Sequence, residues 1–160
     1  MRQMANRNLD ARDDAGFTLI ELLVVVVIIG VLVAIAVPVY LNYRKGAADK
    51  SAQSDVRGAV SAVEQFYTDN NNTYPNTVSG TNDGSASGTT ALTLTAGTGS
   101  NPQTITLSDK TQLGYVNNGV SYLLCGNSGG GSGKWYFYDS SLGGSVKAST
   151  ATSLSLTTCT

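Results

Sequence analysis

Glu21 is the residue of this sequence whose chemistry most needs a partner. It is the one charged side chain in a run of 24 residues from Phe17 to Tyr40. A carboxylate in hydrocarbon costs on the order of 3 kcal/mol or more, so it requires a cation or hydrogen-bond donors. The run has no basic residue, and Arg12 lies nine residues before Glu21 in a polar segment. A cut after Gly16 would create a cationic amine on Phe17, which could pair with Glu21 of the same chain or of a neighbouring subunit.

The remaining composition offers little catalytic or metal-binding chemistry. The chain of 160 residues has no His, two Cys and 13% charged residues, about half the usual proportion. Imidazole catalysis is therefore excluded, and zinc would lack its usual four nitrogen or sulfur ligands. A net charge of -1 with scattered basic residues disfavours nucleic-acid binding. We expect no catalytic residue, no metal site and no cofactor, and a structural or binding protein rather than an enzyme.

Two local motifs look like ligand loops but have simpler explanations. Residues 129–134 are rich in glycine and end in lysine, yet a phosphate loop needs Gly where Ser128 stands and Ser or Thr where Trp135 stands. We expect a hairpin loop there. Residues 69–73 offer oxygen ligands at alternate positions but lack the glycine and the distal glutamate of a calcium loop. We expect a helix cap there.

Cys125 and Cys159 could form a disulfide. The bridge would close a loop of about 34 residues and would stabilise the fold by roughly 3–4 kcal/mol. Disulfides persist outside the cytosol, which suits an exported domain. The alternative is two reduced thiols, one of them packed in the core. A redox role is not expected, because the chain has no Cys-x-x-Cys motif.

A membrane-spanning helix must position Glu21. At 1.5 Å per residue the apolar run is about 36 Å long, which exceeds the roughly 30 Å hydrocarbon core of a bilayer. Strands end near eight residues, so length favours a helix despite the Val and Ile content. Tyr40, Tyr43, Arg44 and Lys45 have the composition expected at a membrane interface. We assign residues 17–43 to the spanning segment, and basic residues on both sides leave its orientation open.

The helix is predicted to continue as an amphipathic segment over residues 44–72. Apolar residues recur at steps of three and four: Ala48, Ala52, Val56, Ala59, Val60, Val63, Phe66 and Tyr67. The opposite, polar face carries Asp49, Lys50, Ser54, Asp55, Arg57, Ser61 and Gln65. One helix from Phe17 to about Asn70, bent at Pro38, is therefore expected.

Residues 73–160 form a head of different composition. Thr, Ser and Gly make up half of it. Short alternating runs predict strands at Ala91–Thr95, Thr104–Ser108, Val120–Cys125, Trp135–Asp139 and Ser153–Thr157. An antiparallel sheet packed on the amphipathic half of the helix would bury the apolar faces of both. The fold class is α+β.

The segment GFTLIELLVVVVIIGVLVAIAVPVY, from Gly16 to Tyr40, resembles the class III signal segment of type IV prepilins and pseudopilins. The resemblance extends to about Pro75 and implies the type IV pilin fold. It implies a leader of residues 1–16, cleavage between Gly16 and Phe17 by prepilin peptidase, and N-methylation of Phe17. The low-charge, Thr-rich head resembles pilins of Gram-positive bacteria.

In that family the acid matching Glu21 registers subunits during filament assembly, and Gly30 and Pro38 match positions where the helix bends or melts. The segment from Cys125 to Cys159 resembles the two-cysteine C-terminal region of many pilins. The resemblance implies a homopolymeric filament with other pilins and the membrane assembly machinery as partners. It also implies a single-pass cytoplasmic-membrane protein before assembly and a cell-surface pilus, serving adhesion, motility or DNA uptake, after it.

Four alternatives stay open. A pseudopilin of a type II secretion or competence system has the same signal, although its major subunits usually have smaller heads and calcium instead of a disulfide. A helix-anchored surface binding protein is a second alternative. The third is an ordinary secretory signal cut after Ala36, but a usual apolar signal region is shorter and has no reason to keep Glu21. An uncleaved anchor would likewise leave Glu21 unpaired.

Overall fold

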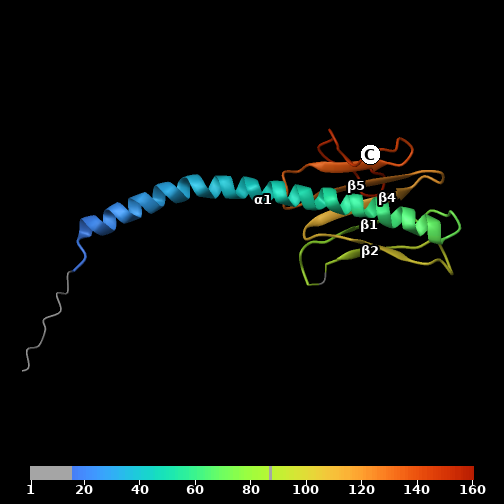
Figure 1. Ribbon diagram of the computed structural model, residues 1–160, viewed down its shortest axis with the longest axis horizontal. Coiled ribbons are helices and arrows are strands. Elements are labelled where there is room, and N and C mark those ends of the chain that lie inside the picture. The colour runs from blue at the N-terminus through green and yellow to red at the C-terminus, as the bar shows by residue number, and fades with distance from the viewer. Residues whose placement is uncertain (1–15, 87) are drawn as a thin grey trace, which may run out of the picture. The chain divides into compact units, whose positions relative to one another are not determined.

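The computed structural model describes residues 16–86 and 88–160 (Figure 1). The chain divides between Val39 and Tyr40 into two compact units, and each is described by itself. The helix α1 (Leu19–Asp69) runs through both units in sequence. The predicted leader lies outside the described residues except for Gly16, so its structure is not considered.

The first unit consists of the apolar part of α1 and the residues that precede it. Among the described residues of this unit, the large apolar side chains are all exposed, from 48% at Val37 to 87% at Leu19. Gly30 and Pro38 both lie inside the helix, and α1 continues through Pro38. The helix is long and apolar enough to cross a membrane. A long helix over this region is confirmed, with its start at Leu19 rather than Phe17; the bend at Pro38 stays a prediction.

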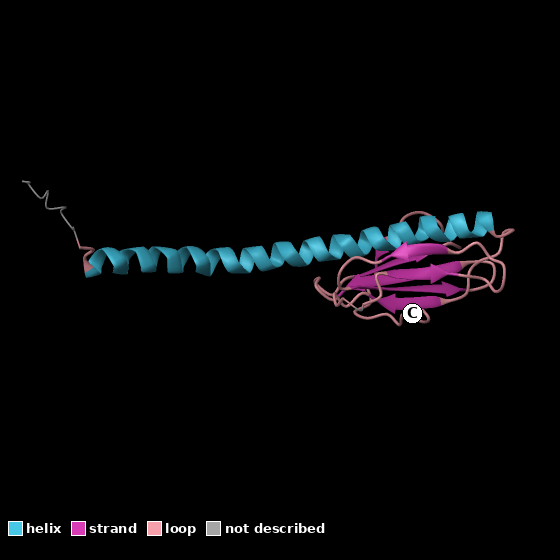
Figure 2. Cartoon of the chain, turned by 90° about the horizontal axis from the view of Figure 1, so that it is seen from below, coloured by secondary structure: helices cyan, strands magenta, loops and turns pink. Residues whose placement is uncertain are grey.

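The second unit packs the later part of α1 against an antiparallel sheet, as the sequence predicts (Figure 2). The five strands lie in the order β1-β4-β5-β6-β7. Their bounds are Val78–Thr81, Thr111–Asn117, Tyr122–Ser128, Trp135–Asp139 and Lys147–Ala148. A separate hairpin pairs β2 (Ala91–Leu94) with β3 (Gln103–Thr106). The architecture is α+β and consistent with the type IV pilin fold.

The main core lies between α1 and one face of the sheet. The helix buries Ala52, Val56, Ala59, Val63 and Phe66, which confirms most of the predicted stripe. The sheet contributes Leu113, Tyr115, Tyr122, Leu124 and Tyr136. Gly126 allows close approach, because a Cβ there would stand 3.0 Å from Cγ2 of Val56. Four of the six aromatic residues between Tyr115 and Tyr138 are buried, so they serve mainly as core.

The opposite face of the sheet is covered by the C-terminal segment. The predicted disulfide is confirmed, with 5.5 Å between the Cα atoms of Cys125 and Cys159. Around it Trp135, Leu154 and Leu156 form a second apolar cluster with neighbouring side chains. A Cβ on Gly114 would collide with the backbone of Leu156. The C-terminal segment therefore packs on the sheet at a point where only glycine fits.

The strand predictions were partly wrong. Residues 153–157 form no strand, because this segment lies over the sheet instead of pairing within it. The strand expected over Val120–Cys125 is β5, which begins two residues later and ends at Ser128. Strands β1 and β4 were missed, since their Gly, Ser, Thr and Gln residues interrupt the apolar alternation.

Both loop predictions are confirmed. Asn71 and Asn72 have φ angles of 52° and 58°, and the N–H of Asn72 donates to the carbonyl of Tyr67 at 3.0 Å. These are the features of a helix end with left-handed residues. Residues 129–134 connect β5 to β6 as a hairpin loop.

Candidate assembly site at the start of the helix

Thr18 and Glu21 form a reciprocal cap at the start of α1. The backbone N–H of Thr18 donates to Oε2 of Glu21 at 2.9 Å, and the Thr18 hydroxyl donates to the same oxygen at 2.7 Å. In return, the backbone N–H of Glu21 donates to the Thr18 hydroxyl oxygen at 3.3 Å. This is a capping box, in which the first helical residues exchange side-chain and backbone hydrogen bonds. It satisfies backbone donors that no helical carbonyl can reach.

This geometry corrects the expectation that the uncut chain offers Glu21 no partner. Thr18 is that partner, and sequence reasoning missed it. The signal was present in the sequence, since Thr followed three residues later by Glu, just before an apolar run, is the pattern of a capping box. In the uncut chain, Glu21 is therefore a hydrogen-bonded carboxylate rather than an isolated one.

The cap leaves Glu21 able to accept a further donor. Among the described residues, Oε1 of Glu21 receives no hydrogen bond, whereas Oε2 receives two from Thr18. Glu21 shares its helix face with Phe17, Ile20 and Val24, which are at least half exposed. An ammonium group on a neighbouring molecule could approach Oε1 without breaking the bonds to Oε2.

No described residue covers the predicted cleavage point. Phe17 is 82% exposed, and a Cβ built on Gly16 would meet no atom within 4 Å. The fold therefore does not shield the peptide bond between Gly16 and Phe17. The predicted cleavage and methylation sites thus adjoin Glu21, whereas Gly30 and Pro38 lie farther along α1 and both cysteines belong to the second unit.

Sequence reasoning also missed residues that fix the second half of α1 to the head. Asp49 and Asp55 were expected on the solvent face, but Asp49 is buried and Asp55 is half-buried. Each carboxylate accepts a backbone N–H and a hydroxyl from one serine: Asp49 from Ser132, and Asp55 from Ser108. The spacing was informative for Asp49, which continues the three-and-four pattern of Ala52 and the later buried residues.

Glu64 and Asp69 extend these contacts along the same helix. The hydroxyl of Tyr122 donates to Oε1 of Glu64 at 2.6 Å, and the side-chain amide of Gln103 donates to Asp69 at 3.2 Å. Burial raises the pKa of the Tyr122 hydroxyl, and the hydrogen bond to Glu64 raises it further. Acids spaced along α1 therefore hold the head at four places.

Known proteins match part of this chain. Residues 11–37 match the family model of the prokaryotic N-terminal methylation motif. Type II secretion system core protein G of Aeromonas hydrophila is 38% identical over 69 residues, which cover 43% of this chain and 48% of that protein. The same protein of Pectobacterium carotovorum subsp. carotovorum is 42% identical over 65 residues, 41% of each chain. Type IV major pilin protein PilE1 of Neisseria gonorrhoeae is 44% identical over 52 residues, 32% of each chain.

The chain therefore carries a type IV pilin signal and is homologous in part to pilins and to a secretion-system core protein. It spans less than half the length of these curated relatives. More than half of this chain lies outside each match. The methylation motif includes Gly16, Phe17, Glu21 and Gly30, so it covers the capping box described above.

Proposed function

We propose that this chain is the precursor of a structural subunit of a type IV pilus. Prepilin peptidase cuts it between Gly16 and Phe17, and the new N-terminus is methylated. The processed subunit then leaves the membrane and joins a helical filament on the cell surface. The observation that carries the proposal is the capped apolar segment, whose large side chains are all exposed and which begins directly after the Gly16–Phe17 bond.

Cleavage changes the charge balance beside Glu21. The cut turns the backbone N–H of Phe17 into an ammonium group, which can donate to Oε1 of Glu21 in an adjacent subunit. Methylation leaves that amine able to carry a proton and a positive charge. Between two subunits out of water this pair would satisfy both charges, whereas a lone carboxylate there would be costly.

Filament growth exchanges lipid contacts for contacts between helices. Lipid chains are as apolar as the side chains of residues 17–43, so this exchange gives little hydrophobic gain. Packing and the pairing of Glu21 must then supply the specificity of association. Each subunit would use different surfaces towards its two neighbours, and such contacts generate an open helical filament when they do not close into a ring.

A pseudopilin of a secretion system is the second candidate, favoured by the identity to core protein G of Aeromonas hydrophila. The disulfide between Cys125 and Cys159 supports the pilin instead, because the resemblance associates two-cysteine heads with pilins. The two functions differ in how far the filament extends from the cell. A pilus extends from the cell as a fibre that can be sheared off, whereas a pseudopilus is a short piston.

The deciding experiment is intact-mass and N-terminal peptide analysis of material sheared from the cell surface. We expect a chain that starts at N-methylated Phe17 and has lost two hydrogens through the disulfide. A chain starting at Val37 would mean a secreted soluble protein, and full-length chain confined to membranes would mean a plain anchor. Processed chain found solely in the membrane fraction would favour the pseudopilin.

A matched pair of variants controls this experiment. Gly16→Ala keeps a small residue before the cut and should be processed, whereas Gly16→Leu should leave the full-length precursor in the membrane. Among the described residues, a Cβ at position 16 would meet no atom within 4 Å, so both variants can be compared without a steric conflict at that atom. Equal processing of the two variants would contradict cleavage after Gly16.

A further inference from the structure

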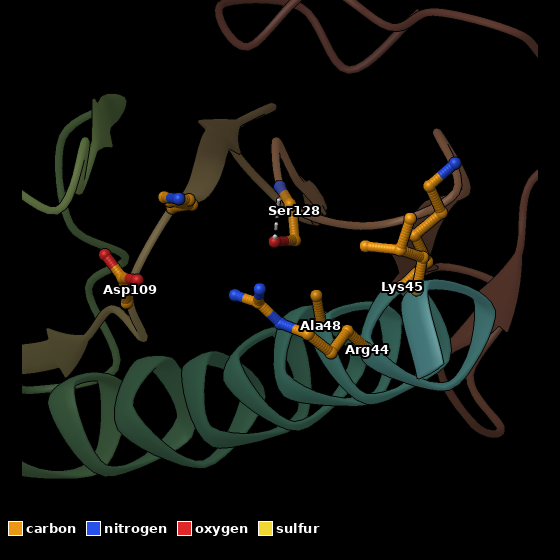
Figure 3. A pocket seen from close by; sticks show the side chains of 8 residues that line it. Arg44, Lys45, Ala48, Asp109 and Ser128 are labelled. Carbon is orange, nitrogen blue, oxygen red and sulfur yellow. Dashed lines mark hydrogen bonds between the residues drawn. The ribbon is translucent and has the colours of Figure 1, made fainter. Parts of the chain in front are cut away.

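Three cationic residues line one pocket of the second unit. Arg44 and Lys45 come from α1 and Lys110 from the turn before β4, and together with neighbouring residues they line a cavity of about 290 Å³ (Figure 3). Asp109 is the one carboxylate in this lining. Three cations against one anion give the pocket a positive charge suited to an anionic ligand.

Figure 3 shows the Arg44 side chain reaching into the space between α1 and Ser128. The Ser128 hydroxyl oxygen accepts the N–H of Gly130 at 3.2 Å, so the hydroxyl hydrogen can still be donated to a ligand. The guanidinium of Arg44 also lies 5.9 Å from the ring centre of Tyr40, one helical turn earlier. Tyr40 can thus favour this placement of the Arg44 charge.

Lys110 is held in an unfavourable backbone conformation. Its φ angle is 59°, a region where Gly and Asn are better tolerated than Lys. Its carbonyl accepts the N–H of Gly129 at 2.8 Å, which fixes the turn. A Cβ on Gly130 would stand 3.6 Å from Cδ of Lys110 and 3.7 Å from Cβ of Ala48, so the lysine stem lies near α1. A lysine kept at such a position is consistent with a use for its charge.

In the sequence, two residues of the pocket come directly after the predicted spanning segment. Arg44 and Lys45 come immediately after Tyr43, the last residue of the predicted spanning segment, and Leu41 of that segment also lines the pocket. Phospholipid headgroups occupy the layer that flanks the hydrocarbon core. Basic side chains in that layer attract anionic lipids, and Leu41 offers an apolar contact for the glycerol or acyl part.

We propose that this pocket binds the phosphate of a phospholipid headgroup while the subunit is stored in the membrane. The proposal rests on the part of the proposed function that places residues 17–43 in the membrane. Arg44 and Lys110 bind the phosphate from opposite walls, and Ser128 donates a hydrogen bond. Free phosphate shares this chemistry, but the adjoining apolar segment favours the lipid as the source.

Native mass spectrometry of the full-length protein in detergent tests the proposal. The probes are dioleoyl phosphatidylglycerol, dioleoylglycerol, which lacks the phosphate, and inorganic phosphate. We expect retention of phosphatidylglycerol in preference to dioleoylglycerol. Lys110→Asn removes the charge while placing a residue that tolerates positive φ, and it should weaken phosphatidylglycerol binding about fivefold. Arg44→Gln should weaken it by a similar factor.

Lys134→Asn is the matched control, because Lys134 is an exposed lysine of the same unit outside the pocket. Its affinity for phosphatidylglycerol should equal that of the wild type. Equal weakening by Lys134→Asn, no weakening by Lys110→Asn, or binding of inorganic phosphate without preference for the lipid would each overturn the proposal. Membrane fractionation distinguishes failure of the proposed function from failure of the lipid-binding proposal. Wild-type protein absent from membranes would contradict the proposed function. Wild-type protein that is present in membranes but shows no preference for phosphatidylglycerol would contradict the lipid-binding proposal alone.

Discussion

Ser132 binds the carboxylate of Asp49 twice, through its backbone N–H at 2.9 Å and its hydroxyl at 2.6 Å. The two residues are separated by 83 positions in the sequence, and Asp49 is 4% exposed. Gly131 makes the approach possible, since a Cβ there would collide with the carboxylate. A buried charge thus ties the β5–β6 loop to α1.

Replacing Asp49 should destabilise the head. Asp49→Ala removes a charge-assisted acceptor and should lower the free energy of unfolding by about 2–3 kcal/mol. The measurement is urea unfolding of the full chain in detergent, followed by the fluorescence of Trp135, the single tryptophan. Lys50→Ala is the control, because Lys50 is exposed and bonds locally to Gln53. A loss of the same size in Lys50→Ala would contradict the assignment.

Gly114→Ala should loosen the C-terminal segment. The added methyl group would meet the backbone of Leu156, and such overpacking typically costs about 1–3 kcal/mol. The same unfolding titration measures it. Gly129→Ala serves for comparison, since its methyl group would find ordinary contact at 3.7 Å from the carbonyl oxygen of Lys110. Equal stability of the two variants would show that the segment can move away from Gly114 at no cost.

The main elements of this fold were predictable because their patterns are long. The apolar run and the stripe from Ala52 to Phe66 specify one helix. The confirmed disulfide between Cys125 and Cys159 was predictable because the chain has two cysteines and therefore one possible pairing. Strand β4 was missed because Leu113 and Tyr115 are the only large apolar residues on its core-facing side, and Gly114 on the other face is covered by Leu156 from elsewhere in the chain. When a segment distant in the sequence covers one face of a strand, the strand's own residues do not show it.

The sequence indicates that Glu21 needs a partner, but it did not lead to the hydrogen bonds that Glu21 forms. The partner within the chain, Thr18, was missed because a threonine carries no charge and so is not an evident counterpart of a carboxylate. Asp49 was wrongly assigned to the solvent-facing side of the helix because it is charged, although its position matches the spacing of the buried residues. In both cases a serine or threonine hydroxyl satisfies the acid, and composition alone cannot locate such a contact.

Thr18→Val should weaken the first turn of α1. The loss of a cap costs roughly 1 kcal/mol, which increases fraying of the helix start. Hydrogen exchange of the amides of residues 19–22 in micelles should be faster by about fivefold, the factor that corresponds to this energy. Thr18→Ser keeps the hydroxyl and should exchange like the wild type. Unchanged exchange in Thr18→Val would mean that the capping box does not form in solution.

Glu21→Ala should separate processing from assembly. If the chain is cut after Gly16 as proposed, we expect the cut not to require the carboxylate, so the mature N-terminus should appear in membranes in nearly normal amount. Sheared filament should fall to a small fraction of the wild-type yield, because the amine of Phe17 loses its acceptor. The measurement compares the processed chain in the membrane and sheared fractions. A normal filament yield would refute the pairing of Glu21 with the amine.

The stability of the head should decline in alkali through Tyr122. Burial and the bond to Glu64 raise the pKa of its hydroxyl above the value of about 10 in the unfolded chain. The folded state then holds this proton more tightly, so its stabilisation is complete below about pH 10 and is lost as the pH rises further. Unfolding titrations between about pH 9 and 11 measure the slope.

Tyr122→Phe provides the comparison for that slope. It should cost about 1.5–3 kcal/mol at neutral pH through loss of the hydrogen bond to Glu64. Its stability should fall less steeply with pH than that of the wild type, although burial also raises the pKa of Tyr115 and leaves part of the slope. Identical slopes would show that Tyr122 does not contribute to the alkaline loss.

The four acid contacts of α1 also determine how the head would bear a pulling force. Asp49, Asp55, Glu64 and Asp69 extend over 20 residues, about 30 Å of helix. A load applied along the helix axis would act on all four contacts in shear and at the same time. Peeling would instead break them one after another at a much lower force. Attachment spread along the helix thus suits a subunit whose fibre is put under tension.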